Sequence, residues 1–239
     1  MILLFTDFGA SGPYVGQMTA SVRSTGYLDD IIPVFSDLPA FSVKASAVLL
    51  DAYMQDFPKN SVFLCVVDPE VGSARKAIAV KCCERWFVGP DNGLFDLLLR
   101  RDATAEAFNI IWKPPTLSNS FHGRDLFAPV AAKIAMGQDF NLLESVPLAS
   151  LFQPKWPKVI AEVVYIDVFG NAMTGISAAS VTGISIRGER LALSRTFSSV
   201  PKNKPLAYVN ANGLIEIAVN QGRADDFFNL AIGTPIEFD

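Results

Sequence analysis

The chain contains a single histidine, His122, which stands among small and charged residues between Ser120 and Asp125. Imidazole is the side chain whose unperturbed pKa lies nearest neutrality, so a histidine in a polar segment suits proton transfer. Upstream, Asp68 and Arg75 flank a short loop that would let the two side chains form an ion pair. The three residues are therefore the first candidates for acid–base chemistry. Their structural alternatives are a surface or helix-capping histidine and an ordinary ion pair.

Three more polar segments have residue types suited to a site. They are residues 6–9, which contain Asp7, residues 89–94, and the segment from Asp167 to Asn171. The structural alternatives are a turn around Asp7, a helix cap in the second segment and a hairpin turn in the third. A metal-dependent phosphatase would use Asp7, Asp68, Asp91 and His122, and would favour magnesium or manganese over zinc. Spacing alone leaves these alternatives open.

The first half of the chain must fold so that these segments come together. Short apolar runs alternate there with segments of helical periodicity, which predicts an α/β domain with a mainly parallel sheet. We expect strands at residues 2–5, 31–35, 62–67, 77–82 and 86–88, and helices at 13–25, 42–55, 92–101 and 127–136. Several polar segments directly follow these strands, and the carboxyl ends of such strands carry the ligand sites of α/β folds.

Beyond a proline-rich and lysine-rich stretch at residues 153–158, the helical periodicity disappears. We therefore predict an N-terminal domain at residues 1–152, a linker at 153–158 and a C-terminal domain at 159–239. Short apolar runs separated by turn residues favour a small β-barrel or sandwich for the second domain. Its strands are expected at residues 159–166, 183–187, 191–193, 206–209, 214–219 and 235–238.

The composition narrows the classes of partner and location. Half of the 239 residues are hydrophobic, which allows a sizeable core, and the net charge of -4 argues against a nucleic-acid partner. The odd number of cysteines, Cys65, Cys82 and Cys83, cannot all pair and favours a reducing, cytoplasmic compartment. Their spacing does not indicate zinc. No segment approaches the ~20 apolar residues of a membrane span, and the N-terminus lacks the basic region of a signal peptide.

Five motifs occur in one order along the chain: TDFG…YVG, VVDPxVGSxR, GPDNGL, SFHGRDxFAP and DxFGN. This set resembles the S-adenosyl-L-methionine (SAM) hydroxide adenosyltransferases, the SAM hydrolases related to the SAM-dependent fluorinase and chlorinase. The resemblance implies attack of water on the ribose C5′ of SAM, which gives adenosine and L-methionine without a metal or other cofactor. It also implies an α/β domain followed by a β-barrel, and a homotrimer with active sites between subunits.

The resemblance assigns roles to residues of this chain. An Asp–Arg–His triad that holds the attacking water maps onto Asp68, Arg75 and His122, and the halogenase branch lacks that triad. Histidine is the better proton acceptor of the three, so we expect His122 to take the proton of the water or to polarise it. The implied substrate contacts are Asp7 on the ribose hydroxyls, Ser120 and Phe121 beside the nucleoside with Phe169, Asp167 on the methionine ammonium, Asn171 on the adenine edge, and backbone groups near Asn220 and Gln221.

Four positions depart from the family pattern, and they concern the amino-acid end of the substrate or the surroundings of Asp68. Gly12 stands where relatives have an aspartate, residues 33–36 lack the family's DxTH, Glu70 replaces a glycine, and Ala211–Asn212 replace the halogenase Ser-Arg. Three alternatives follow: a SAM hydrolase with altered methionine recognition, an enzyme for a related 5′-substituted adenosine, or a non-catalytic adenosine or SAM binder. A halogenase-like transferase is the poorer alternative because the triad is present.

Overall fold

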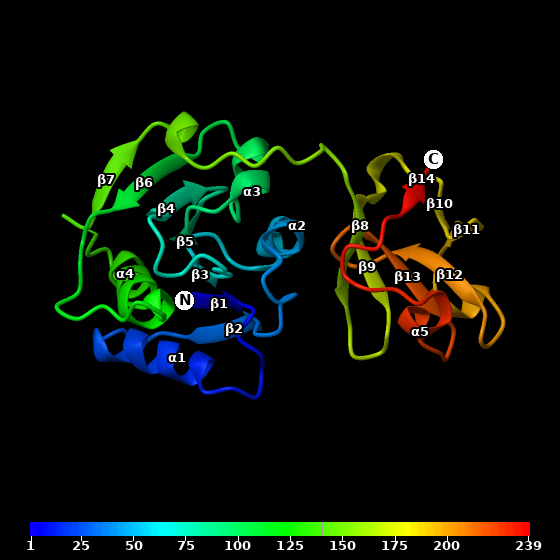
Figure 1. Ribbon diagram of the computed structural model, residues 1–239, viewed down its shortest axis with the longest axis horizontal. Coiled ribbons are helices and arrows are strands. Elements are labelled where there is room, and N and C mark those ends of the chain that lie inside the picture. The colour runs from blue at the N-terminus through cyan, green and yellow to red at the C-terminus, as the bar shows by residue number, and fades with distance from the viewer. Residues whose placement is uncertain (140) are drawn as a thin grey trace. The chain divides into compact units, whose positions relative to one another are not determined.

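The computed structural model describes residues 1–139 and 141–239 (Figure 1). It contains two compact units, of which the first comprises Met1–Leu50 and Met54–Pro154 and the second Asp51–Tyr53 and Lys155–Asp239. Each unit has its own seven-stranded sheet and its own apolar core. In the part of the chain that is described, no helix has the length and apolar character needed to cross a membrane.

The sheet of the first unit has the strand order β2-β1-β3-β5-β4-β6-β7. Its strands are β1 (Ile2–Thr6), β2 (Ile31–Phe35), β3 (Val62–Val66), β4 (Ala77–Cys82), β5 (Arg85–Pro90), β6 (Glu106–Ile110) and β7 (Leu143–Val146). The pairs β2–β1, β1–β3 and β3–β5 are parallel, whereas β5–β4, β4–β6 and β6–β7 are antiparallel.

The prediction of a mainly parallel sheet was therefore wrong, because the sheet is mixed. Only Cys83 and Glu84 separate β4 from β5. A two-residue connection can only reverse the chain into a hairpin, since a parallel pair needs a crossover of a dozen or more residues. Strands β6 and β7 were not expected, because β6 carries exposed Glu106 and β7 is half exposed. Neither shows the apolar run of an interior strand.

The helices of the first unit cover both faces of its sheet (Figure 1). They are α1 (Tyr14–Ser24), α2 (Val43–Tyr53, of which residues 43–50 belong to this unit), α3 (Asp96–Arg101) and α4 (Ala128–Ala135), with a π-helical turn at Gly123–Phe127 and 3₁₀ turns at Met54–Asp56 and Leu148–Ser150. On one face, Met18 of α1 and Val130 of α4 pack on Leu4 and Leu64. The helix predicted at residues 92–101 begins only at Asp96, because residues 91–95 form bends and a turn.

The sheet of the second unit nearly closes into a barrel. Its order is β14-β10-β11-β12-β13-β9-β8, and the segment just before β14 bonds to the opposite edge strand through Glu162 and Pro235. The elements are β8 (Ile160–Ile166), β9 (Ala172–Ser177), β10 (Gly183–Ile186), β11 (Glu189–Ser194), β12 (Pro205–Val209), β13 (Leu214–Val219), β14 (Glu237–Phe238), α5 (Ala224–Phe228) and 3₁₀ turns at Ala178–Ser180 and Phe197–Ser199. The six predicted strands are present, and β9 and α5 were missed.

Candidate active site

Asp68, Arg75 and His122 meet at one end of the strands of the first sheet, although they come from three segments of the chain. Asp68 follows β3, Arg75 precedes β4, and His122 precedes the π-helical turn that leads into α4. Arg75 Nε donates to Asp68 Oδ1 at 2.9 Å and Oδ2 at 3.0 Å, and Arg75 Nη2 also donates to Oδ2. The same Nη2 lies 2.9 Å from His122 Nδ1. The structure thus brings together the three residues that the sequence singled out.

The Asp68–Arg75 pair is buried, with only 4% and 5% of the two side chains exposed. The guanidinium carbon also lies 5.2 Å from the centre of the Phe127 ring. Taking both charges out of water is costly, and a two-point contact between a guanidinium and a carboxylate is the geometry that best offsets that cost. Asp68 therefore fixes the position of Arg75, and Arg75 in turn contacts the imidazole.

The contact with Arg75 determines which nitrogen of His122 carries the proton. A guanidinium can only donate hydrogen bonds, so Nδ1 must accept and the neutral ring carries its proton on Nε2. Burial lowers the pKa of His122, and the nearby charge of Arg75 lowers it further, while Asp68 and Asp125 oppose the shift. His122 is therefore neutral at neutral pH and presents an Nε2–H donor.

Gly72 explains why the Asp68–Arg75 loop can lie beside the histidine segment. It has a φ of +83°, and a Cβ at this position would come within 2.6 Å of the backbone oxygen of Asn119. Only glycine adopts this backbone conformation freely and also allows so close an approach. Gly72 thus positions one segment of the site against the other.

Asn92, in the GPDNGL motif, holds the other side of the same loop. Its Nδ2 donates to the carbonyl oxygen of Val67 at 2.9 Å, directly before Asp68, and its Oδ1 accepts from Leu94 N–H at 3.3 Å. The backbone N–H of Asp91 donates to the carbonyl oxygen of Lys76 at 3.0 Å, directly after Arg75. The turn therefore fixes the backbone at both ends of the loop that carries Asp68 and Arg75.

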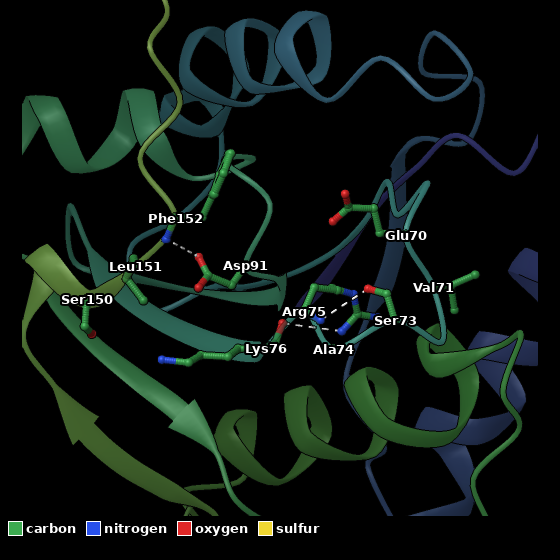
Figure 2. Close-up of a pocket in the computed structure, with 10 residues that line it drawn as sticks. All are labelled: Glu70, Val71, Ser73, Ala74, Arg75, Lys76, Asp91, Ser150, Leu151 and Phe152. Atoms are coloured by element: carbon green, nitrogen blue, oxygen red, sulfur yellow. Dashed lines mark hydrogen bonds between the residues drawn. The ribbon is translucent and has the colours of Figure 1, made fainter.

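A cavity of about 650 Å³ lies beside this turn, and Figure 2 shows the residues around it. Asp91 projects into it, and its Oδ1 accepts from the backbone N–H of Phe152 at 2.8 Å. Burial raises the pKa of Asp91, and the Phe152 N–H and Lys76 oppose that rise. The side chains around this cavity are Glu70, Val71, Ser73, Ala74, Arg75, Lys76, Asp91, Ser150, Leu151 and Phe152.

Replacing Asn92 by alanine or aspartate is expected to lower kcat by at least about tenfold, with little change in KM. Both variants lose the donor to Val67, and a shift of about 1 Å in a reacting group can cost as much as a hundredfold. Steady-state kinetics measure the effect. Asp91→Asn keeps an acceptor for Phe152 and is the matched control, expected near wild-type kcat. An Asn92→Asp enzyme with unchanged kcat would show that the hydrogen bond to Val67 does not position the site.

A cavity of about 380 Å³ lies next to the triad, in the first unit. Asp7 and Asp68 both line it, and the rings of Phe8, Tyr14 and Phe121 form an aromatic wall, packed edge to face with centres 5.5–5.7 Å apart. The lining residues are Asp7, Phe8, Tyr14, Ala40, Phe41, Val66, Asp68, Val71, Ser120, Phe121, His122 and Gly123. A carboxylate facing aromatic rings is the combination that suits a nucleoside, with its sugar hydroxyls and flat base.

Asp7 is held by a residue that sequence reasoning missed. The backbone N–H of Phe41 donates to Asp7 Oδ2 at 3.0 Å. Phe41 has a φ of +63° and leaves 76% of its surface exposed. Burial raises the pKa of Asp7, while the Phe41 N–H lowers it. Phe8 and Tyr14 were also missed, although both lie within the first motif. No local signal marked Phe41, because only its backbone contact identifies it.

The remaining predicted residues lie in the second unit, where Asp167 closes a turn. Its Oδ1 accepts from the backbone N–H groups of Phe169 and Asn171, both at 2.9 Å, and its Oδ2 accepts from Asn171 Nδ2 at 2.9 Å. The segment from Asp167 to Asn171 therefore forms a hairpin turn, as its structural alternative predicted. Phe169 is 72% exposed, whereas Asn171 is buried.

The predicted pair Asn220 and Gln221 follows β13, close in sequence to the residues that hold this turn. Asn220 Nδ2 donates to the carbonyl oxygen of Val200 at 2.8 Å, and Gln221 has a φ of +55°. The next residues contact the turn directly: the backbone N–H groups of Ala224 and Asp225 both donate to the Gly170 carbonyl oxygen at 3.0 Å. Asn220 and Gln221 thus lie a few residues along the chain before the backbone groups that hold this turn.

The alternative of a metal-dependent phosphatase finds no support in the arrangement of the carboxylates. Within residues 1–139 and 141–239, the one set of three His, Cys, Asp or Glu side chains spaced to share an ion is Cys82, Cys83 and Asp102. The carboxylates near the cavity do not form such a set, and Asp68 binds Arg75 with both oxygens.

The comparisons with known proteins agree with the motifs. The N-terminal domain of the SAM hydroxide adenosyltransferases matches residues 2–144, and the C-terminal domain of that family matches residues 161–237. A protein of Thermus thermophilus named (R)-S-adenosyl-L-methionine hydrolase is 34% identical. The alignment is 258 residues long with its gaps and covers 98% of each chain. A protein of the same name from Salinispora arenicola is 34% identical over 95% of this chain and 93% of its own.

Among solved structures, an uncharacterised conserved protein from Thermotoga maritima has a TM-score of 0.89 and 30% sequence identity, and the alignment covers 100% of this chain and 99% of the other. Motifs, fold and relatives thus agree over almost the whole length of both units. The chain belongs to the SAM hydroxide adenosyltransferase family.

Proposed function

We propose that this protein is an S-adenosyl-L-methionine hydrolase, which splits SAM into adenosine and L-methionine by attack of water on the ribose C5′. The observation that carries the proposal is the buried Asp68–Arg75 pair in contact with His122, beside a cavity that Asp7, Asp68 and His122 line. Membership of the family and the names of the full-length relatives support the same reaction. The reaction uses no metal or other cofactor.

The leaving group explains why so small a set of residues suffices. SAM is a sulfonium, and its methionine moiety departs as a neutral thioether, so the reaction needs no general acid. The site must hold a water molecule in line with the C5′–S bond, close enough to react. The attack produces a protonated 5′-hydroxyl, which is a strong acid and loses its proton to solvent.

The tautomer of His122 favours one of its two expected roles. Because Nδ1 accepts from Arg75, the ring offers an Nε2–H donor and no free acceptor. We therefore assign His122 to holding and orienting the attacking water, and not to removing its proton. Asp68 and Arg75 act through the imidazole, whose orientation they fix.

Substrate contacts follow from the residues around the cavity and from the turn of the second unit. Asp7 accepts from the ribose hydroxyls, and Ser120 and Phe121 lie beside the nucleoside. The second unit contributes Asp167 at the methionine ammonium, Phe169 on the base, Asn171 at the adenine edge and backbone groups near Asn220 and Gln221. The exposed ring of Phe169 suits a residue that meets a ligand.

We further propose a homotrimer in which the second unit of a neighbouring copy completes each site. The exposed Val168 and Phe169, at 79% and 72%, support this arrangement. Mixing inactive His122→Ala with inactive Asn171→Ala protein tests it: a shared site regains activity in mixed oligomers, and a site within one chain does not.

The odd number of cysteines, which cannot all form disulfides, supports a cytoplasmic location.

The direct test is incubation of EDTA-treated protein with SAM, followed by chromatography of the products. We expect equal amounts of adenosine and methionine, with no need for halide and no 5′-halo-adenosine. His122→Ala should lower turnover by about a hundredfold or more. A thermal shift with adenosine or SAM but no turnover would instead mean a binding protein. Turnover that EDTA removes would mean a metal enzyme.

A related 5′-substituted adenosine is the second candidate, favoured by Gly12 and by Ala211–Asn212 at the amino-acid end of the substrate. Such a substrate must still carry a sulfonium at C5′, because a neutral thioether would leave as a poor thiolate. The 5′-dimethylsulfonium analogue of adenosine, which lacks the amino acid, distinguishes the two. A substantially higher kcat/KM for this analogue than for SAM would move the natural substrate away from SAM.

Gly12→Asp is expected to lower the KM for SAM by about tenfold. It restores a charged contact to the methionine ammonium, and such a contact contributes about 1.5–3 kcal/mol. A Cβ at Gly12 meets the Phe8 oxygen and the Tyr14 ring only at 3.5 Å, which is ordinary van der Waals contact. Steady-state kinetics with SAM and with the analogue measure the change, and the analogue should show none. A KM for SAM that stays the same would mean that methionine is recognised elsewhere.

A further inference from the structure

A cluster of two thiols and one carboxylate lies at the other end of the strands of the first sheet, away from the triad. Cys82 ends β4 and Cys83 begins the turn to β5, while Asp102 directly follows α3. The Sγ atoms of the two cysteines are 3.4 Å apart, and one oxygen of Asp102 lies within 4.8 Å of both. Strand β5 has six residues, so the cluster is roughly 20 Å from the catalytic end at about 3.3 Å per residue.

The backbone holds the three side chains in this arrangement. The N–H of Cys83 donates to Asp102 Oδ2 at 2.6 Å, and Thr104 donates to Oδ1 through its N–H at 2.8 Å and its hydroxyl at 2.6 Å. The hydroxyl and N–H of Thr104 and the N–H of Cys83 lower the pKa of Asp102 to about 2. The carboxylate is therefore charged at any physiological pH and cannot turn away without losing these bonds.

The turn itself adopts a conformation that these residues seldom take. Cys83 and Glu84 have φ values of +50° and +58°, which hairpin turns of this kind usually give to asparagine or glycine. Arg85 Nη1 donates to the carbonyl oxygen of Cys83 at 2.7 Å and helps to fix the turn. The turn thereby directs both Sγ atoms towards the end of α3.

We propose that Cys82, Cys83 and Asp102 bind a thiophilic d¹⁰ cation of the zinc type, with water in the remaining position. Two thiolates and a carboxylate are ligands that zinc prefers and magnesium does not. Two sulfurs bound tetrahedrally at ~2.3 Å lie about 3.8 Å apart, so the observed 3.4 Å need open only by a few tenths of an ångström. On binding, each thiol gives its proton to solvent and forms one metal–sulfur bond.

The exposure of the cluster fits a site that takes up an ion from solution. Cys82 is buried, whereas Cys83 and Asp102 are half-buried and give the ion access. Burial raises the pKa of the Cys82 thiol, and the neighbouring Cys83 and Asp102 raise it further. A bound cation would remove this repulsion and link the β4–β5 turn to the end of α3, which stabilises the first unit.

Zinc content and cadmium absorbance test the proposal on the full-length, chelator-free protein kept reduced. We expect one zinc ion per chain after equilibration and dialysis, thiolate-to-cadmium charge-transfer absorbance that saturates at one ion per chain, and a higher melting temperature with zinc. Cys83→Ser should weaken binding by more than about a hundredfold and remove the thermal shift, because it deletes a ligand and outer-shell losses alone reach that size. Asp102→Asn should weaken binding less.

Two variants, Cys65→Ala and His122→Ala, are controls for zinc binding, and the activity of the wild-type protein on SAM is a third control. Cys65 is a buried thiol of β3 outside the cluster, so its removal should leave binding unchanged. Loss of zinc binding in His122→Ala instead would place the ion at the catalytic end and overturn the proposal. So would the absence of stoichiometric zinc in the reduced wild-type protein, or binding that survives in Cys83→Ser. Activity on SAM should be the same with and without zinc.

Discussion

Asp68→Ala is expected to abolish hydrolysis and to lower the free energy of unfolding by about 3–5 kcal/mol, the cost of leaving a buried charge without its partner. The charge left behind is the guanidinium of Arg75, whose side chain is only 5% exposed. Without Asp68, the guanidinium must be hydrated or displaced, and His122 loses the donor that sets its orientation. Urea denaturation measures the stability, and chromatography of adenosine measures the activity.

A second variant separates the two effects. In Asp68→Ala/Arg75→Met no charge remains buried, so most of the lost stability should return, while hydrolysis stays absent. Glu106→Gln is the control for a surface pair, because Lys81 and Glu106 are 3.8 Å apart and more than half exposed. It should change stability by less than about 1 kcal/mol. An Asp68→Ala protein as stable as the wild type would show that the pair is not buried in solution.

The pH profile of kcat/KM is expected to be flat through neutrality and to fall on the acid side with an apparent pKa below 6.5. The pKa of His122 is lowered from that ordinary value by burial and by Arg75, so the ring stays neutral to a lower pH than a free histidine. Below the shifted pKa the ring gains a proton on Nδ1, which then faces the guanidinium and breaks the contact. An acid limb at or above pH 6.5 contradicts this account, provided that melting curves show the protein folded there.

Substitutions at His122 distinguish a donor from a base. His122→Ala should lower kcat by roughly a hundredfold or more, the usual scale for a group that assists proton movement or orients the nucleophile. His122→Gln retains an N–H near the position of Nε2 and cannot act as a base, so it should keep part of the activity and lose the acid limb. If glutamine is as inactive as alanine, His122 takes the proton of the water, and the assignment as donor is wrong.

Many residues of the candidate site were singled out from the sequence because they are concentrated at strand ends. Asp7 follows β1, Asp68 follows β3 and residues 91–92 follow β5, and parallel neighbours bring their carboxyl ends to one edge. His122 and Arg75 were identified by type and by their motif, and the structure joins them to Asp68. Phe41 could not be predicted, since its role is a backbone N–H directed at Asp7.

The parts of the fold that were missed share a physical cause. Strand β7 is the edge strand of the sheet and β6 is its neighbour, and both carry exposed polar residues that weaken the apolar pattern. The direction of β4 depends on a two-residue turn whose cysteine and glutamate carry no usual turn signal. The sheet was therefore predicted as mainly parallel when it is mixed.

The family, the order of its motifs and the residue types of the triad could be recognised from the sequence, because they are local patterns that do not depend on the fold. Three features became visible only in the folded chain: which nitrogen of His122 is free, the hydrogen bond from Asn92 to the loop before Asp68, and the position of Asp102 beside two adjacent cysteines. Each of these is a contact between segments far apart in the chain. Such contacts depend on the register and packing of whole strands, which no local pattern specifies.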